Sequence, residues 1–108
     1  MNDDLVLTEI HPSGYAVLTL NRPDNANVLD MQMGRDLLAA VTACEQDAAL
    51  RAVMLTGAGK HFCFGGDLRG MQSSGGAPDA YLRELTTNLH RAIVGLVRLD
   101  APVIAIVK

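Results

Sequence analysis

Apolar residues recur at every third or fourth position along one central stretch of the chain, and this spacing restricts the fold more than any other feature. The stripe consists of Leu29, Met33, Leu37, Val41, Cys44 and Ala48. It predicts an amphipathic helix over 30–47, with Asp30 as its N-cap. A continuous apolar run over 52–56 follows and is typical of a strand that is buried on both faces. A helix followed directly by such a strand favours an α/β fold with a largely parallel sheet.

The rest of the chain continues this alternation. Residues 5–20 contain two β-rich runs separated by His11-Pro12-Ser13-Gly14, which predicts a hairpin. We expect a glycine-rich turn over 57–71, a polar surface loop over 72–78, a second helix over 79–99 and a further core strand over 102–107. The predicted apolar face of the second helix consists of Leu82, Leu85, Leu89, Ile93 and Leu96.

Composition excludes several classes of function. A chain of 108 residues with 49% hydrophobic residues is sufficient for one domain. The net charge of −3 argues against a nucleic-acid partner, and no apolar run approaches the roughly 20 residues that span a bilayer. Cys44 and Cys63 are far apart and the histidines have no ligand-like neighbours, so no metal site is predicted. The acidic start and the two cysteines favour a reduced, cytoplasmic protein.

The glycine-rich turn is the main candidate for a functional site. Adjacent glycines allow backbone N–H groups to face a ligand, and a helix that starts just after them adds unpaired donors, which predicts an anion or oxyanion site. The P-loop pattern fails, because Met54 and His61 stand where it requires a glycine and a Ser or Thr. The dinucleotide fingerprint fails as well, because Phe62 stands where it requires its last glycine.

The segment Phe62-Cys63-Phe64-Gly65-Gly66-Asp67-Leu68 resembles the crotonase superfamily, also called the enoyl-CoA hydratase/isomerase family. Further matches at 18–23, 27–29, 53–57 and 102–105 occur in the order and spacing of that family. The resemblance implies an α/β, crotonase-like ββα spiral and an acyl-CoA thioester as the ligand. Coenzyme A would enter as part of the substrate, with no covalently bound cofactor. It also implies a homo-oligomer, since family members form trimers or pairs of trimers.

The resemblance also implies roles for individual residues. The backbone N–H of Gly66 takes the place of one of two donors to the thioester carbonyl oxygen. The Phe64 carbonyl takes a position that contacts the adenine of coenzyme A. The other residues assigned to the coenzyme A site are Ala26, Val28, Gly65, Asp67 and Leu68. Arg22, Lys60 and Arg69 are candidates for its phosphates, with solvated surface charge as the alternative.

Three side chains near these positions have two interpretations each. Asp67 is a catalytic candidate, but a residue just after such a turn is more often an N-cap. His90 lies beside the apolar stripe of the second helix, from which a base reaches the acyl group in a few family members; an ordinary boundary histidine is the favoured interpretation. Cys63 precedes the turn, and we expect it to fill space as a small buried side chain.

The family's second oxyanion donor and its acid/base carboxylates follow the strand that here ends at Lys108. The sequence therefore resembles the N-terminal portion of such an enzyme, apparently truncated, and we expect no crotonyl-CoA hydration from these 108 residues alone. Two functions remain open. One is an enzyme of the enoyl-CoA hydratase/isomerase type, and the other is an inactive fragment that retains fold elements and self-associates or binds partners.

Overall fold

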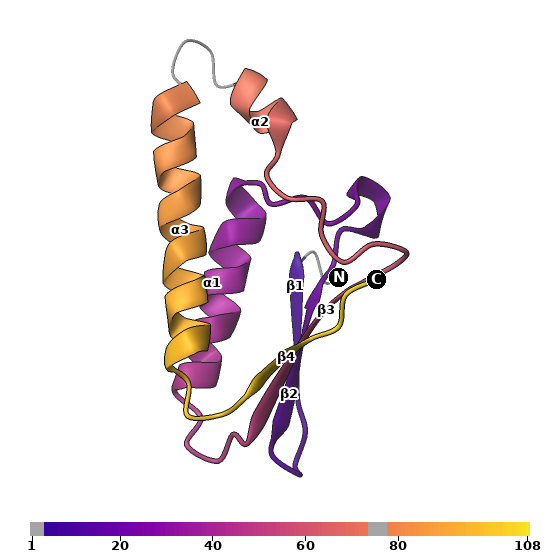
Figure 1. Cartoon of the computed structure of the whole chain (residues 1–108), viewed down its shortest axis with the longest axis vertical. Helices are drawn as coiled ribbons and strands as arrows, with labels where there is room; N and C mark the ends of the chain where they lie inside the picture. The colour runs from indigo at the N-terminus through magenta and orange to yellow at the C-terminus, as the bar shows by residue number, and fades with distance from the viewer. Residues whose placement is uncertain (1–3, 74–77) are drawn as a thin grey trace.

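A four-stranded sheet with two long helices on one side makes up the molecule (Figure 1). The computed structural model describes residues 4–73 and 78–108. The strands are β1 Val6–Ile10, β2 Tyr15–Leu20, β3 Ala52–Gly57 and β4 Val103–Ala105, and they lie in the order β1-β2-β3-β4. The helices are α1 Met31–Glu45, the short α2 Leu68–Gln72 and α3 Pro78–Arg98, with a 3-10 turn, η1, at Pro23–Asn25. In Figure 1, α1 lies between the sheet and α3.

The hairpin and the parallel strands follow from short-range and periodic signals in the sequence. β1 and β2 pair antiparallel across a turn in which Gly14 has a φ of +102°, a conformation that glycine adopts without strain. β2 pairs parallel with β3, and β3 pairs parallel with β4. This arrangement confirms the predicted α/β class with a largely parallel sheet.

Only one face of the sheet is covered by helices. In β2, Ala16, Leu18 and Leu20 are buried, whereas the alternate residues are only half-buried. The register places Ala16 beside Val53, which is the fully buried apolar residue of β3. The prediction that 52–56 is buried on both faces is therefore wrong. Alternate side chains of a strand point to opposite faces, and the face without helices stays partly exposed.

α1 follows its predicted stripe closely. Asp30 caps the helix by accepting a hydrogen bond from the Met33 N–H at 2.8 Å. Met33, Leu37, Val41 and Cys44 are buried, as the spacing predicts. Ala48 is exposed because the helix ends at Glu45, two residues before the predicted end, and the chain turns there.

α3 presents a different face from the predicted one. Leu85, Ala92 and Leu96 are buried, whereas Ile93 is 50% exposed and Leu82 is 37% exposed, so these two predictions are wrong. The reason is a close approach of the two long helices: a Cβ added at Gly95 would lie 2.7 Å from the Val41 side chain. Small residues at this contact rotate α3, and Ala92 occupies the inner position instead of Ile93.

The last predicted strand is shorter and more exposed than expected. β4 covers Val103–Ala105 rather than 102–107, and all its residues are exposed. It pairs with β3 on one side only and lies outside the helix-covered core, so the prediction of a core strand is wrong. Of the predicted 72–78 loop, 74–77 lie outside the described residues, while Gln72 belongs to α2 and Pro78 begins α3.

Candidate functional site

The glycine-rich turn after β3 lies against the segment that joins η1 to α1. Three backbone hydrogen bonds connect the two stretches. Phe64 N–H donates to Ala26 O at 3.1 Å, Leu29 N–H donates to Gly65 O at 2.7 Å, and Asp67 N–H donates to Leu29 O at 3.1 Å. These bonds, which we call the ladder, thus anchor the turn to the residues just before α1.

Gly66 occupies the open side of this ladder. Leu29 and Gly66 are paired as in a parallel sheet. The two hydrogen bonds of Leu29 go to the Gly65 carbonyl and the Asp67 N–H, which lie on either side of Gly66. The Gly66 N–H therefore faces away from Leu29, and it has no acceptor among residues 4–73 and 78–108. Gly66 is exposed, and a Cβ added there would meet nothing within 4 Å. The result is a fixed, accessible hydrogen-bond donor.

Gly65 is required for another reason. Its φ is +93°, in the left-handed region that favours glycine, and its N–H donates to Cys63 Sγ at 3.3 Å. The two neighbouring glycines thus differ: Gly65 makes the turn possible, and Gly66 presents the free donor.

Asn27 connects the two stretches from inside. Its side chain is fully buried at 0% exposure, and its φ is +53°. The side-chain oxygen accepts from Arg22 N–H at 2.7 Å, and the amide nitrogen donates to Ala58 O at 3.0 Å and His61 O at 2.8 Å. The sequence analysis did not assign a role to Asn27. The available signal was the residue type, since Asn tolerates the left-handed region and carries both donors and an acceptor.

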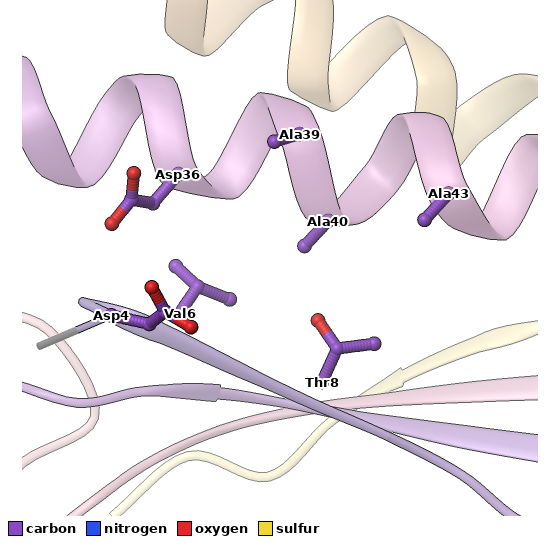
Figure 2. A pocket seen from close by; sticks show the side chains of 7 residues that line it. All are labelled: Asp4, Val6, Thr8, Asp36, Ala39, Ala40 and Ala43. Atoms are coloured by element: carbon purple, nitrogen blue, oxygen red, sulfur yellow. The ribbon is translucent and has the colours of Figure 1, made fainter. Parts of the chain in front are cut away.

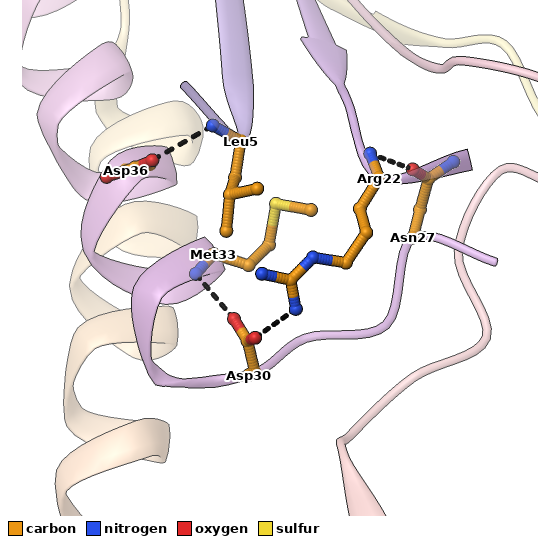
Figure 3. A network of polar contacts seen from close by, with 6 residues as sticks. All are labelled: Leu5, Arg22, Asn27, Asp30, Met33 and Asp36. Atoms are coloured by element: carbon orange, nitrogen blue, oxygen red, sulfur yellow. Dashed lines mark hydrogen bonds and ion pairs between the residues drawn. The ribbon is translucent and has the colours of Figure 1, made fainter. Parts of the chain in front are cut away.

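Arg22 is already paired, unlike the other basic candidates. Its guanidinium donates to Asp30, whose second oxygen caps α1, so one carboxylate connects the 21–30 segment to the helix (Figure 3). Lys60 and Arg69 are exposed. Lys108, which the sequence analysis did not assign, donates from Nζ to Gly57 O at 2.6 Å and to Gly59 O at 2.8 Å. It therefore holds the beginning of the turn.

Two exposed apolar side chains flank Gly66. Phe64 is 67% exposed and Leu68 is 70% exposed, and the His61 ring lies 4.5 Å from that of Phe64. Ala26 and Val28 are half-buried on the neighbouring stretch. The structure thus brings all seven predicted site residues to one region, held by the ladder. Asp67 immediately precedes α2, and its role as an N-cap remains a prediction.

Tyr81 of α3 approaches the same region. Burial raises the pKa of the Tyr81 phenol, and the charges of Asp67 and then Asp30 raise it further. A hydrogen bond with the Met31 backbone lowers it in part. The phenol therefore stays protonated at neutral pH.

His90 lies on the surface of α3, and Cys63 is less buried than the sequence predicts. His90 is exposed and lines a shallow groove with Glu45 and Arg98, near the end of α1 that is remote from Leu29. Cys63 is half-buried and packs against the core. His90 therefore lies at the other end of α1 from Gly66, whereas Cys63 Sγ accepts the Gly65 N–H beside it.

One further hollow of the described surface lies apart from the predicted site residues. A hollow between β1 and α1 has alanines of α1 on one side, Val6 and Thr8 of β1 on the other, and Asp4 and Asp36 at one end (Figure 2). None of the predicted site residues lines it. Within the described part of the chain, no group of three or more His, Cys, Asp or Glu side chains is placed to hold a metal ion. None of the described helices is long and apolar enough to cross a membrane.

This chain is similar to known proteins in both sequence and fold. A family model described as enoyl-CoA hydratase/isomerase matches residues 11–108. The chain is 37% identical to 1,2-epoxyphenylacetyl-CoA isomerase of Escherichia coli over 70% of this chain and 29% of that protein. It is 30% identical to a mitochondrial 3-hydroxyisobutyryl-CoA hydrolase of Gallus gallus, over 87% of this chain and 25% of that protein.

The crystal structure of an enoyl-CoA hydratase from Mycobacterium smegmatis superposes with a TM-score of 0.87 and 36% identity. The match covers 95% of this chain and 39% of that one, so the chain spans well under half the length of the proteins it resembles. The match confirms the crotonase-like fold that the sequence predicts for this N-terminal portion. On the sequence match and the fold together, the chain belongs to the enoyl-CoA hydratase/isomerase family.

Proposed function

We propose that this chain binds an acyl-CoA thioester and that the Gly66 N–H donates a hydrogen bond to the thioester carbonyl oxygen. One observation carries the proposal: the Gly66 N–H is accessible and has no acceptor among the described residues, while Gly65 and Asp67 on either side are bonded to Leu29. Membership of the enoyl-CoA hydratase/isomerase family supports the choice of ligand.

A donor held in this way would act on the transition state. When a nucleophile adds to the alkene, or a base removes an α-proton, negative charge moves onto the thioester oxygen. A prealigned N–H stabilises that charge without reorganising. Loss of one oxyanion donor typically costs on the order of 10²–10³ in rate. The ladder to Leu29 would keep the donor in place before the ligand arrives.

The remaining contacts would belong to coenzyme A. We assign them to the Phe64 carbonyl and to Ala26, Val28, Gly65, Asp67 and Leu68. The exposed faces of Phe64 and Leu68 are surfaces that a ligand would cover. The proposed reaction class is hydration of a trans-2-enoyl-CoA or isomerisation of its double bond. The second donor and the acid/base carboxylates would come from outside these 108 residues.

Removal of the donor tests the proposal. Crotonyl-CoA and free coenzyme A are titrated by calorimetry against the unmodified chain, Gly66→Pro and Gly66→Ala. Proline removes the N–H, whereas alanine keeps it and meets no neighbour. We expect Gly66→Pro to weaken crotonyl-CoA binding about tenfold, as for loss of one hydrogen bond, and to leave coenzyme A binding unchanged. Gly66→Ala should bind both ligands as the unmodified chain does.

Equal affinity of Gly66→Pro and the unmodified chain for crotonyl-CoA would refute the proposal. Circular dichroism checks that the proline variant is folded. A backbone ester at residue 66, made by chemical ligation, removes the same N–H with no change of side chain and replaces the proline variant if that one unfolds.

The exposed edge of the sheet favours a second candidate function, which is self-association. Ile104 is 53% exposed, Ile106 is 43% exposed and Val107 is 71% exposed, beside a strand that pairs on one side only. We propose that this edge pairs with a second copy of the chain, because open apolar edges template strand addition. Sedimentation velocity should show a concentration-dependent dimer that Ile104→Lys abolishes. A monomer at every concentration would contradict this.

A further inference from the structure

The segment 22–30 is closed by contacts between its two ends. The Arg22 guanidinium forms an ion pair with the Asp30 carboxylate (Figure 3). The Arg22 backbone takes part as well, since its N–H donates to Asn27 Oδ1 at 2.7 Å and its carbonyl accepts from the Asn27 N–H at 3.0 Å. Bringing the ends of a segment together restricts the conformations of the residues between them. The contacts of Arg22 therefore restrict the whole segment.

The Asp30 carboxylate joins this closed segment to α1. One oxygen, Oδ2, accepts from Arg22 Nη1, and the other, Oδ1, accepts from the Met33 N–H at 2.8 Å. The side chain of Arg22 is 27% exposed and that of Asp30 is 18% exposed, so salt screens their attraction less than that of an open surface pair. One carboxylate thus fixes the segment and the start of the helix with respect to each other.

All three bonds of the ladder end inside the closed segment. Ala26 O accepts one of them, and Leu29 makes the two on either side of Gly66. Leu29 directly precedes Asp30 in the chain, so a displacement of Asp30 would move both of these bonds. The orientation of the Gly66 N–H therefore depends on where the Arg22–Asp30 pair holds Leu29.

The same ion pair makes Arg22 a poor ligand for a phosphate. A carboxylate beside a guanidinium compensates its charge and repels an incoming phosphate. We propose that Arg22 is a positioning residue, which holds the Gly66 N–H in place through Asp30 and does not bind the phosphates of coenzyme A. The consequence for ligand binding rests on the proposed function, whereas the effect on the ladder does not.

Amide hydrogen exchange tests the positioning without any ligand. Arg22→Met removes the charged group and keeps an unbranched side chain. We expect the Leu29 and Asp67 amides, which donate the ladder bonds on either side of Gly66, to exchange about tenfold faster in this variant. Arg22→Lys, which restores a positive charge, should bring both rates back toward those of the unmodified chain. Unchanged exchange at Leu29 and Asp67 in Arg22→Met, or a lysine variant that exchanges as fast as the methionine variant, would overturn the inference.

Arg35→Met is the matched control, because it removes another ion pair of α1. Arg35 Nη2 lies 3.1 Å from Glu84 Oε1, and the two side chains are 52% and 58% exposed. This variant should leave the Leu29 and Asp67 rates unchanged, and amides of β2 and β3 should be unchanged in both methionine variants. Equal acceleration in Arg35→Met, or acceleration throughout β2 and β3 in Arg22→Met, would indicate a general loss of stability and contradict the inference.

Asp30→Asn separates the ion pair from the helix cap. Asparagine caps a helix as well as aspartate does, so the Met33 amide should keep its protection while the charge is lost. We expect Leu29 and Asp67 to exchange as fast in Asp30→Asn as in Arg22→Met. The double variant should be no faster than either single one, because both remove the same contact. Additive acceleration in the double variant would show that Arg22 does not act through Asp30.

Calorimetric titrations separate this inference from the proposed function. If the unmodified chain binds crotonyl-CoA, Arg22→Met should bind it about fivefold more weakly and bind free coenzyme A with unchanged affinity. If Arg22→Met binds both ligands more weakly by the same factor, Arg22 contacts the phosphates and the inference fails. The inference also fails if Arg22→Met binds crotonyl-CoA as well as the unmodified chain does. If the unmodified chain does not bind crotonyl-CoA, the proposed function fails, while the exchange data still decide the role of Arg22.

Discussion

The helix-covered core and the glycine-rich turn are held together by different forces. In the core, Leu18, Met33, Val41 and Val53 are fully buried apolar side chains. In the turn, the large apolar side chains Phe64 and Leu68 are mostly exposed. The turn is held instead by backbone bonds to Ala26 and Leu29 and by the buried amide of Asn27. Apolar packing holds the core, whereas hydrogen bonds hold the exposed turn.

The largest expected loss of stability comes from replacing Asn27, whose side chain makes three of the hydrogen bonds that hold the turn. Asn27→Ala leaves the Arg22 N–H and the carbonyls of Ala58 and His61 without their partner. These bonds are part-buried, so each lost bond should cost near the lower end of the roughly 1–3 kcal/mol of a buried unpaired group, and we expect a total loss of about 3 kcal/mol in the free energy of unfolding by urea.

Asn25→Ala is the matched control, because the Asn25 side chain makes no hydrogen bond among the described residues. It should change stability by no more than about 0.5 kcal/mol. If both alanine variants are equally stable, the turn does not depend on the Asn27 amide.

Alanine substitutions at the two adjacent glycines should change stability by different and smaller amounts. Gly65→Ala forces a side chain into a φ of +93° and should cost about 1–2 kcal/mol of unfolding free energy. Gly66 has open space at its Cβ position and is not among the residues with positive φ, so Gly66→Ala should change stability by less than about 0.5 kcal/mol. Urea unfolding of the two variants side by side measures the difference. The reverse order of stability would mean that the turn has another conformation.

The smallest expected difference is in the reactivity of two thiols, Cys44 in the core and Cys63 at the turn. Burial raises the pKa of the Cys44 thiol, and the charge of Asp47 raises it further, so Cys44 should resist alkylation by iodoacetamide in the folded chain. Cys63, half-buried at the turn, should react first. Mass spectrometry of peptides after brief labelling measures both. Equal labelling of Cys44 and Cys63 in the folded chain would contradict the burial of Cys44.

The raised pKa of Cys44 also has a consequence at alkaline pH. The unfolded chain ionises this thiol near its ordinary value of 9.0, and the folded chain ionises it only at higher pH. Any contribution of Cys44 to stability is therefore complete below pH 9.0 and is lost as the pH rises toward the folded value.

The sequence predicts the core better than it predicts the turn. Periodicity records which side chains are buried, and it correctly places Met33, Leu37 and Val41 inside. It misplaces Ile93, because the contact between the long helices is set by the small residues Ala92 and Gly95, which leave little trace in an apolar pattern. Exposure of β4 is also missed, since periodicity does not show which face of a strand a neighbour covers.

The role of Gly66 was predicted from resemblance to a family, whereas the hydrogen bonds that hold the turn were found only in the structure. The bonds to Leu29 join backbone atoms, and those of Asn27 reach carbonyls more than thirty residues away. Backbone contacts between distant segments have no side-chain signature.

The most direct test of the central claim follows the amide signals of the turn during a titration with crotonyl-CoA. In two-dimensional ¹⁵N–¹H spectra, the Gly66 amide proton should move downfield and saturate as it acquires an acceptor. The amide of Asp67, already bonded to Leu29 O, should move less, and free coenzyme A should leave Gly66 in place. A Gly66 amide that stays unmoved at saturation with crotonyl-CoA, or moves equally with free coenzyme A, would contradict the assignment of Gly66 as the thioester donor.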